Sequence, residues 1–282
     1  MGTDNYYSVK EDVQKYIDGC KTKMNVRTHK VFGRAVLAGM MIAFGASASN
    51  VAAHAVTNVG LSRLVAGCVF PVGLMMIVFV GGELFTGDCM MSMAWMQRKI
   101  HFADMLRTLV LVYVSNFVGA ALIAFLVAHS GQYDYSSGAL GAYTIKVAYG
   151  KVHLSFANAL VSGILCNILV CVAVLMAAAA KDIAGKVLAI FFPILAFVVS
   201  GFEHCVANMY YIPAGIFASK NAAYAAKAFE LYNIDSTQLS SLNWGSFAIS
   251  NLIPVTIGNI IGVALLVGGA CFYLHGKALH ES

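Results

Sequence analysis

One short polar stretch in the second half of the chain decides the fold, and it reads GFEHCVAN over residues 201–208. It interrupts an apolar run that extends from about Val187 to Phe217 and contains Pro193 and Pro213. Unwound backbone at membrane depth is tolerated only where it is buried in protein or lines a water-filled cavity. The stretch therefore predicts a membrane helix that is broken half-way across.

A second stretch of the same kind lies in the first half and reads GGELFTGD over residues 81–88. It interrupts an apolar run from about Leu64 to Met96, which is too long for one ordinary crossing of about 20 residues. Polar breaks in corresponding spans of two halves are typical of a permeation site. The pair of breaks therefore directs attention to the centre of a membrane domain.

The composition agrees with a membrane protein and excludes several other classes. The 282 residues are 60% hydrophobic and only 11% charged, and the mean hydropathy is +0.76, whereas a soluble domain carries about 25% charged residues. The seven cysteines are widely spaced and include no C-x-x-C pair. This spacing argues against a disulfide-rich protein and against a metal site made of cysteines. The net charge of +5 comes from scattered Lys and Arg, a pattern of membrane topology and not of a nucleic-acid partner.

Six apolar spans are predicted, and they divide into two similar halves. Their approximate ranges are residues 33–56, 64–96, 105–129, 156–180, 187–217 and 247–274. Three short matches recur in the same order: residues 35–41 with 159–165, Glu83 and Asp88 with Glu203 and Asn208, and residues 116–119 with 259–262. Because each half has three spans, the halves must be inverted. We expect an all-α integral membrane protein with an inverted 3+3 repeat.

The positions of the basic residues predict the topology. Most of the 18 Lys and Arg residues lie on the side that carries both termini, so both termini should be cytoplasmic in a multi-pass protein of the cell (inner) membrane. Residues 1–30 are predicted to be a cytoplasmic amphipathic helix, from the spacing of Val9, Val13, Tyr16 and Ile17, or else a solvated tail. Residues 31–282 form the predicted six-span transmembrane domain.

The side chains of the two breaks are the candidates for chemistry. His204 is ionisable at predicted mid-membrane depth, which makes it a functional candidate by default, and histidine titrates near physiological pH. The alternative is a neutral core histidine with both nitrogens bonded. Thr86 lies in the other break and offers a hydroxyl to His204 or to a solute, although it can also bond to its own helix.

Four further polar residues of the breaks are expected to be a scaffold. Glu83 and Glu203 should each accept backbone N–H groups that the break in the opposite half leaves open, and Asp88 and Asn208 should do the same. A proton relay is the alternative for the two glutamates. A metal site is not expected, because the remaining ligands are missing.

Other candidates flank the breaks. Lys151 precedes the fourth span, where it can attract an anion or simply extend toward the interface. The large apolar residues Phe70, Leu74 and Phe197 each precede a break. A pore lined by such side chains excludes hydrated ions when it is narrow, although aromatic residues in membrane spans also serve packing alone.

At these residues the chain resembles the formate/nitrite transporter family. The matching pieces are GELFTG at 82–87, KVH at 151–153 followed by GILCN at 163–167, and GFEH at 201–204 followed by Asn208-Met209. Together with the order of the six spans, they extend over nearly the whole chain. The sequence looks most like the hydrosulfide-channel branch of that family.

The resemblance implies a homopentamer of aquaporin-like protomers in the lipid bilayer, each with its own pore for small monovalent anions of weak acids. It assigns constrictions to Phe70 and Leu74 on one side and Phe197 on the other, with Thr86 and His204 between them. It places Lys151 and Asn167 on the outer approach. Hydrosulfide is the favoured solute, with formate and nitrite as related solutes, because the sequence as a whole looks most like that branch. Leu154 stands where the formate branch has a second histidine, which disfavours a plain formate channel.

Three rival interpretations use the same residues. A proton-coupled formate or nitrite symporter differs from a channel in saturation and in its dependence on the proton gradient. A neutral-solute pore of the aquaporin type would need Asn-Pro-Ala pairs, which the sequence lacks. An enzyme would need a nucleophile–base or metal constellation, and one histidine beside a threonine does not make one. No enzyme activity and no cofactor are therefore expected.

Overall fold

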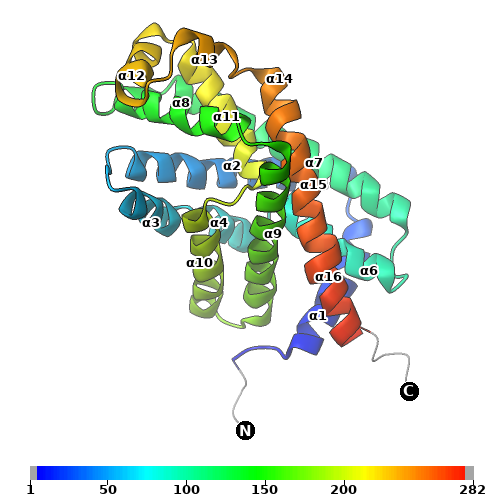
Figure 1. Ribbon diagram of the computed structural model, residues 1–282. Helices are drawn as coiled ribbons and strands as arrows, with labels where there is room; N and C mark the ends of the chain where they lie inside the picture. The colour runs from blue at the N-terminus through cyan, green and yellow to red at the C-terminus, as the bar shows by residue number, and fades with distance from the viewer. Residues whose placement is uncertain (1–4, 277–282) are drawn as a thin grey trace, which may run out of the picture.

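The computed structural model describes residues 5–276, and all of its long elements are helices (Figure 1). Six helical segments are long and apolar enough to cross a membrane. They are α2 (Thr28–Ala53), α3 with α4 (Val59–Val69 and Val72–Val80), α7 (Phe102–Ala128), α9 (Phe156–Ala179), α10 (Ile183–Ser200), and the segment from Trp244 to His275. The prediction of an all-helical membrane protein with six spans is confirmed.

The remaining elements are shorter. Those before α9 are α1 (Val9–Met24), α5 (Phe85–Asp88), η1 (Cys89–Met91), α6 (Ser92–Met96), η2 (Gln132–Asp134) and α8 (Ala139–Val152). Those that follow are α11 (Cys205–Ser219), α12 (Ala222–Tyr232) and α13 (Ser236–Ser240). The sixth span consists of α14 (Trp244–Ser246), α15 (Ile253–Ile260) and α16 (Gly268–Cys271), joined by the π-helical segments η3 (Phe247–Leu252), η4 (Ile261–Val267) and η5 (Phe272–Gly276).

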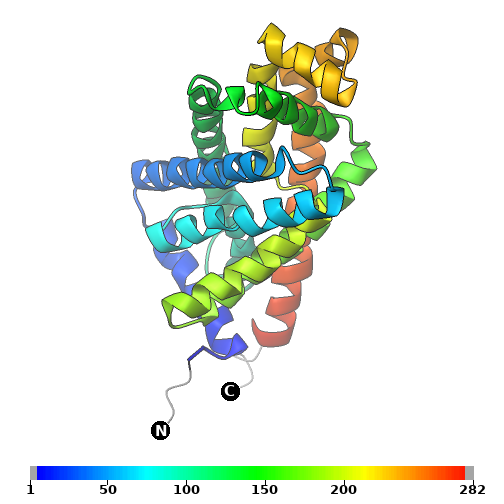
Figure 2. The ribbon, with the colours of Figure 1, turned by 90° about the vertical axis from the view of Figure 1, so that its left-hand side faces the viewer.

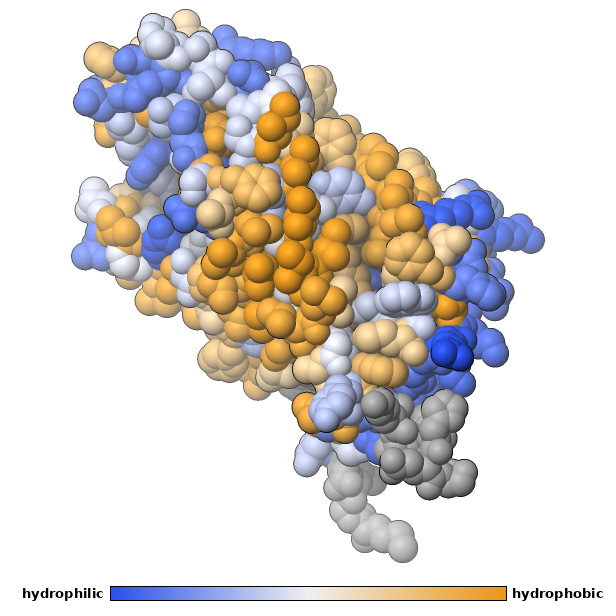
Figure 3. All heavy atoms as spheres, turned by 45° about the vertical axis from the view of Figure 1, so that its right-hand side comes forward, coloured by the Kyte–Doolittle hydropathy of each residue, from blue (hydrophilic) through white to orange (hydrophobic). Residues whose placement is uncertain are grey.

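The molecule has two polar ends with an apolar band between them. Helices α8, α12 and α13 gather at one end, which we call the α8 end, and α1 packs against η5 at the opposite α1 end (Figures 1 and 2). Figure 3 shows the apolar surface between more hydrophilic regions. The acyl chains of a bilayer would cover this band.

Both predicted breaks are present. Helix α4 ends before Gly81 and α10 ends before Gly201, and these glycines have φ angles of 79° and 71°. Glycine adopts this left-handed conformation without the steric penalty of a side chain, so it ends a helix readily. The chain becomes helical again at Phe85 and Cys205, respectively.

The second span is more interrupted than predicted. Helix α3 ends at Val69 and α4 begins at Val72, with Pro71 between them. Proline has no N–H to donate and crowds the preceding turn, which accounts for this extra interruption. After the break the chain forms the short pieces α5, η1 and α6 instead of one helix.

The two halves are repeats, but the predicted alignment of the first and fourth spans is wrong by one helical turn. Asn116 Nδ2 donates to the carbonyl of Ala35, and Asn259 Nδ2 donates to the carbonyl of Gly163, each over 2.7 Å. These bonds pair Ala35 with Gly163, whereas the sequence match paired Ala35 with Ala159. Small residues recur at every turn where membrane helices approach closely, so the letters alone permit a shift of one turn.

The repeat also extends beyond the three spans of each half. Helix α1 directly precedes α2, and α8 directly precedes α9. Lys23 precedes Ala35 by as many residues as Lys151 precedes Gly163, so the two lysines are equivalent. Helix α1 is not a solvated tail: Ile17 is fully buried and α1 packs against α6, α9 and η5. Each half therefore consists of a short helix followed by three spans.

The packing of α1 should weaken as the pH rises. Asp12 of α1 is buried, its Oδ1 has no hydrogen-bond partner among the described residues, and burial raises the pKa of this carboxyl to about 6, against the opposing effect of Lys15 and Lys186. A group with a raised pKa in the folded state stabilises it most at low pH, and this contribution is lost as the pH rises through about 6. The hydrogen-exchange protection factors of α1, which are corrected for the intrinsic pH dependence of exchange, should therefore be lower at about pH 7.5 than at about pH 5, and Asp12→Asn should reduce this difference. Equal pH dependence in the variant would contradict the prediction.

Candidate functional site

Two asparagines hold the backbone of the two breaks. Asn116 Oδ1 accepts the N–H of Phe85 over 2.9 Å, and its Nδ2 donates to the carbonyls of Ala35 and Glu83 over 2.7 and 2.9 Å. One amide side chain thus satisfies three backbone groups, because it offers both an acceptor and two donors.

Asn259 does the same in the other half. Its Oδ1 accepts the N–H of Cys205 over 2.9 Å, and its Nδ2 donates to the carbonyls of Gly163 and Glu203 over 2.7 and 3.0 Å. Both asparagines are fully buried. The matching Asn-x-x-Gly stretches at 116–119 and 259–262 were the signal for this role, although sequence reasoning used them only as marks of the repeat.

The predicted role of Glu203 and Asn208 as acceptors of backbone N–H groups is wrong. Glu203 Oε1 pairs with Lys151 Nζ over 2.7 Å, and its Oε2 accepts from the Nδ2 atoms of Asn208 and Asn251 over 2.6 and 3.3 Å. Asn251 also donates to the carbonyl of Lys151 over 2.9 Å. A carboxylate close to a lysine gains more from this charge-assisted bond than from a neutral N–H, which explains the difference.

The corresponding prediction for Glu83 and Asp88 is also wrong. Both carboxylates form ion pairs with Lys23 of α1, and Arg34 Nη1 lies 3.8 Å from Glu83 Oε1. The Tyr16 hydroxyl of the same helix donates to the carbonyl of Gly87 over 3.0 Å. Lys23 at the α1 end therefore has the position that Lys151 has at the α8 end, in agreement with their equivalence in the repeat.

His204 and Thr86 are brought together from the two breaks. His204 Nε2 lies 3.0 Å from Thr86 Oγ1, and both side chains are buried. His204 also caps α11, since its Nδ1 accepts the N–H of Ala207 over 3.0 Å. Because Nδ1 is an acceptor, the hydrogen of the neutral ring is on Nε2, where it faces the threonine oxygen.

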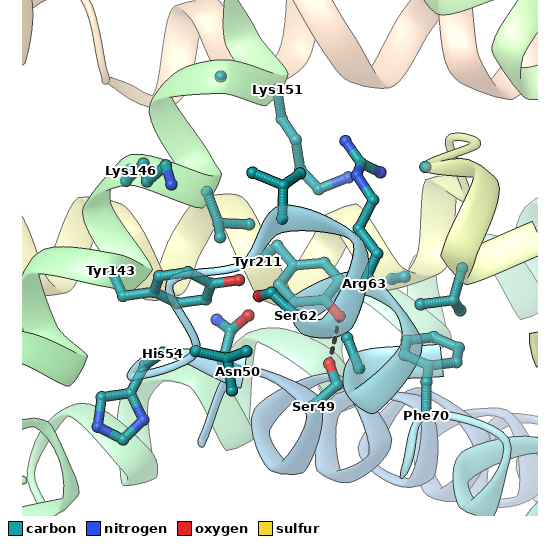
Figure 4. A pocket seen from close by; sticks show the side chains of 18 of the residues that line it. Ser49, Asn50, His54, Ser62, Arg63, Phe70, Tyr143, Lys146, Lys151 and Tyr211 are labelled. Carbon is teal, nitrogen blue, oxygen red and sulfur yellow. Dashed lines mark hydrogen bonds between the residues drawn. The ribbon is translucent and has the colours of Figure 1, made fainter. Parts of the chain in front are cut away.

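A cavity of about 830 Å³ leads from the α8 end toward this pair (Figure 4). Lys151, His204, Phe70 and Phe197 are among its lining residues. The rings of Phe70 and Phe197 contact each other edge to face, with centroids 5.4 Å apart. The expectation that they lie on opposite sides of Thr86 and His204 is therefore wrong, because the two broken spans bring both rings into one apolar layer.

Three predicted residues lie away from the cavity lining. Thr86 is fully buried behind His204, and Leu74 is buried on α4. Asn167 is also fully buried: its Nδ2 donates to the carbonyl of Asn259 over 2.8 Å, while its Oδ1 has no partner among the described residues. Of the two residues expected on the approach, Lys151 lines the cavity and Asn167 does not.

The sequence model of the formate/nitrite transporter family matches residues 10–273. The chain belongs to this family. The family is one of transport proteins, so the chain is a transporter and not an enzyme. Within residues 5–276, no group of three His, Cys, Asp or Glu side chains is placed to hold a metal ion.

Named relatives of the family are similar over most of their length. The formate channel FocA of Haemophilus influenzae is 39% identical over 249 residues, which is 87% of each chain. The probable formate transporter of Methanothermobacter thermautotrophicus is 40% identical over 262 residues, covering 86% of this chain and 87% of the relative.

Solved structures of the family share the fold. A pentameric formate channel with formate bound matches with a TM-score of 0.77 and 31% identity, over 89% of this chain and 98% of the other. A structure named FNT family ion channel matches with a TM-score of 0.80 over 93% and 98%, but its 24% identity supports the fold alone. The chain is thus a formate/nitrite transporter family protomer in its architecture.

Proposed function

We propose that the chain is a channel for small monovalent anions of weak acids, with one pore in each protomer of a homopentamer. The observation that carries this proposal is the His204–Thr86 pair behind the Phe70–Phe197 layer, at the inner end of a cavity with lysine in its wall. The names of the relatives support formate as a solute. The resemblance in sequence supports hydrosulfide first, with nitrite and formate beside it.

The proposed path starts at the α8 end, which we expect to lie outside the cell with both termini in the cytoplasm, because most basic residues lie on the side of the termini. An anion enters the cavity under the attraction of its basic residues and loses water at the phenylalanine layer. It then takes a hydrogen bond from His204 Nε2. Since Nδ1 already accepts the N–H of Ala207, we infer that His204 acts as a donor of hydrogen bonds and not as a proton source.

Flux into proteoliposomes tests the function. Formate, nitrite and hydrosulfide should pass while chloride is excluded, and uptake should not require a proton gradient, as it would in a proton-coupled symporter. His204→Ala should lower the flux at least about tenfold, since it removes a hydrogen bond to an anion in a buried site. Equal chloride flux, or a variant identical to the native protein, would contradict the proposal.

His204→Asn is the matched variant. An asparagine can cap α11 and can still donate to an anion, but it cannot carry a proton. If His204 is a donor only, this variant should retain much of the flux with the native pH profile. A changed pH profile for weak acids but not for a strong-acid anion would instead assign proton transfer to His204.

The order of the solutes follows from the same assay. Leu154 lines the cavity with an apolar side chain, which favours a weakly hydrated anion and supports hydrosulfide ahead of formate. Faster formate than hydrosulfide flux at equal anion concentrations would reverse this order without affecting the class of solute. A mass in mild detergent near five times 30.0 kDa would support the pentamer.

A further inference from the structure

One guanidinium in the cavity wall has no partner among residues 5–276. Arg63 of α3 lines the cavity, and it is the single Lys or Arg between Arg34 and Arg98 in the sequence. Within residues 5–276 it forms no ion pair or hydrogen bond. Arg63 lies near the start of its span and is exposed, so its charge is open to a solute in the cavity.

The other two basic chains of the cavity wall are already engaged. Lys151 pairs with Glu203. The Lys146 amino group lies over the rings of Tyr143 and Tyr232, 5.6 and 4.7 Å from their centroids. Since Glu203 neutralises Lys151, the net positive charge of the cavity wall comes from Lys146, whose amino group lies on aromatic rings, and from Arg63.

The position of Arg63 relates it to the break. Its guanidinium lies directly against Gly201, where a Cβ atom would collide with Nη1. Figure 4 shows Arg63 and Lys151 reaching from α3 and α8 into the same part of the cavity. Phe70 and Phe197 line this cavity too, so an anion held by Arg63 would lie on the way to the apolar layer.

We propose that Arg63 forms an anion-binding site in this cavity that binds planar anions with two oxygen atoms, such as carboxylate and nitrite, more tightly than hydrosulfide or chloride, whereas the solute order proposed above concerns passage through the pore and not binding at this site. The guanidinium presents parallel N–H groups that match two oxygens at once, whereas a lysine ammonium acts as a point charge. A hydrosulfide ion has one acceptor atom and cannot use both N–H groups. The site rests on the proposed function, and through it the cavity selects among anions before they reach the Phe70–Phe197 layer.

The pair Arg63→Lys and Arg63→Gln separates shape from charge. Arg63→Lys should raise the half-saturating concentration of formate and nitrite about fivefold and leave that of hydrosulfide within about twofold. Arg63→Gln should raise the values for all three anions. The maximal rates should change little, because the central pair of the pore is intact.

Lys146→Gln is the matched control, since it removes a positive charge from the same cavity wall without removing a free guanidinium. It should affect the three anions equally. Formate values in Arg63→Lys that match the native ones would overturn the selection by shape, and native values in Arg63→Gln would overturn the site itself.

A binding measurement separates this proposal from the proposed function. Equilibrium dialysis of radiolabelled formate against the detergent-solubilised native protein should show binding that Arg63→Gln weakens and Lys146→Gln retains. If the native protein binds formate in this way but passes no anion, the channel function fails and the site stands. Equal binding by the native protein and Arg63→Gln contradicts the site, whatever the flux.

Discussion

Replacing Asn259 by alanine is expected to lower the stability of the fold strongly. The variant leaves two backbone groups of the second break without a partner in a buried place, the N–H of Cys205 and the carbonyl of Glu203, and it also removes the bond to the carbonyl of Gly163 in α9. Each unsatisfied buried group costs about 1–3 kcal/mol. The sum of about 5 kcal/mol is comparable with the whole stability of many domains. Size-exclusion chromatography after heating in mild detergent would show the loss.

Two matched variants locate the cause. Asn259→Asp keeps the acceptor for Cys205 N–H but sets a buried carboxylate oxygen against the carbonyls of Gly163 and Glu203, so its melting temperature should be no higher than that of Asn259→Ala. Asn167→Ala removes one bond, to the carbonyl of Asn259, and should have a smaller effect. A native-like melting temperature for Asn259→Ala would show that the break does not depend on this amide.

Replacing Lys151 by methionine is expected to damage both stability and flux. Glu203 is 5% exposed, and Lys151 is its cationic partner. Removal of one member of a buried ion pair costs about 3–5 kcal/mol, because the other charge is left uncompensated. The cavity also loses a cation that attracts anions. Thermal stability and proteoliposome flux measure the two effects separately.

The double variant Lys151→Met with Glu203→Gln distinguishes the effect on stability from the effect on flux. A glutamine at this position is neutral and can still accept the hydrogen bonds of Asn208 and Asn251, so stability should recover most of the way. Flux at low anion concentration should stay reduced if Lys151 attracts the solute. Full recovery of flux would assign to Lys151 the single task of neutralising Glu203.

The six spans and both breaks could be predicted because their signals are local. An apolar run of sufficient length predicts a span without any knowledge of the helices that pack against it. Gly201, Glu203 and His204 are polar or small residues that clearly interrupt such a run. The structure places the left-handed glycines at Gly81 and Gly201, inside the predicted breaks. Local sequence therefore determined most of the fold.

The partners of the polar residues could not be predicted, because they come from distant segments. Glu83 meets a lysine of α1, and Glu203 meets a lysine of α8. The choice of asparagine to hold the broken backbone depends on helix α7 or α15 crossing the break at one particular residue. Spacing in the sequence gives no information about such crossings.

The edge-to-face contact of Phe70 with Phe197 was missed for the same reason. Each ring precedes a break in its own half, and the sequence has no mark that the inverted halves bring these two positions together. By contrast, the meeting of His204 with Thr86 was foreseen as one of the options for the threonine hydroxyl. Inverted repeats place equivalent residues at opposite ends, but they bring non-equivalent residues together at the centre.

The two lysine sites also differ in one respect that affects conduction. Asp88 at the α1 end has Asn208 as its counterpart at the α8 end, so an otherwise repeated arrangement carries an additional carboxylate on one side. Lys23 and Arg34 balance Glu83 and Asp88, whereas Arg63 leaves the α8 end with an excess positive charge. The electrostatic potential along the pore is therefore asymmetric, and anion currents driven by voltages of opposite sign should be unequal in size. Rectification would thus follow from Arg63 at the α8 end, because Lys23 and Arg34 already balance the additional carboxylate at the other end.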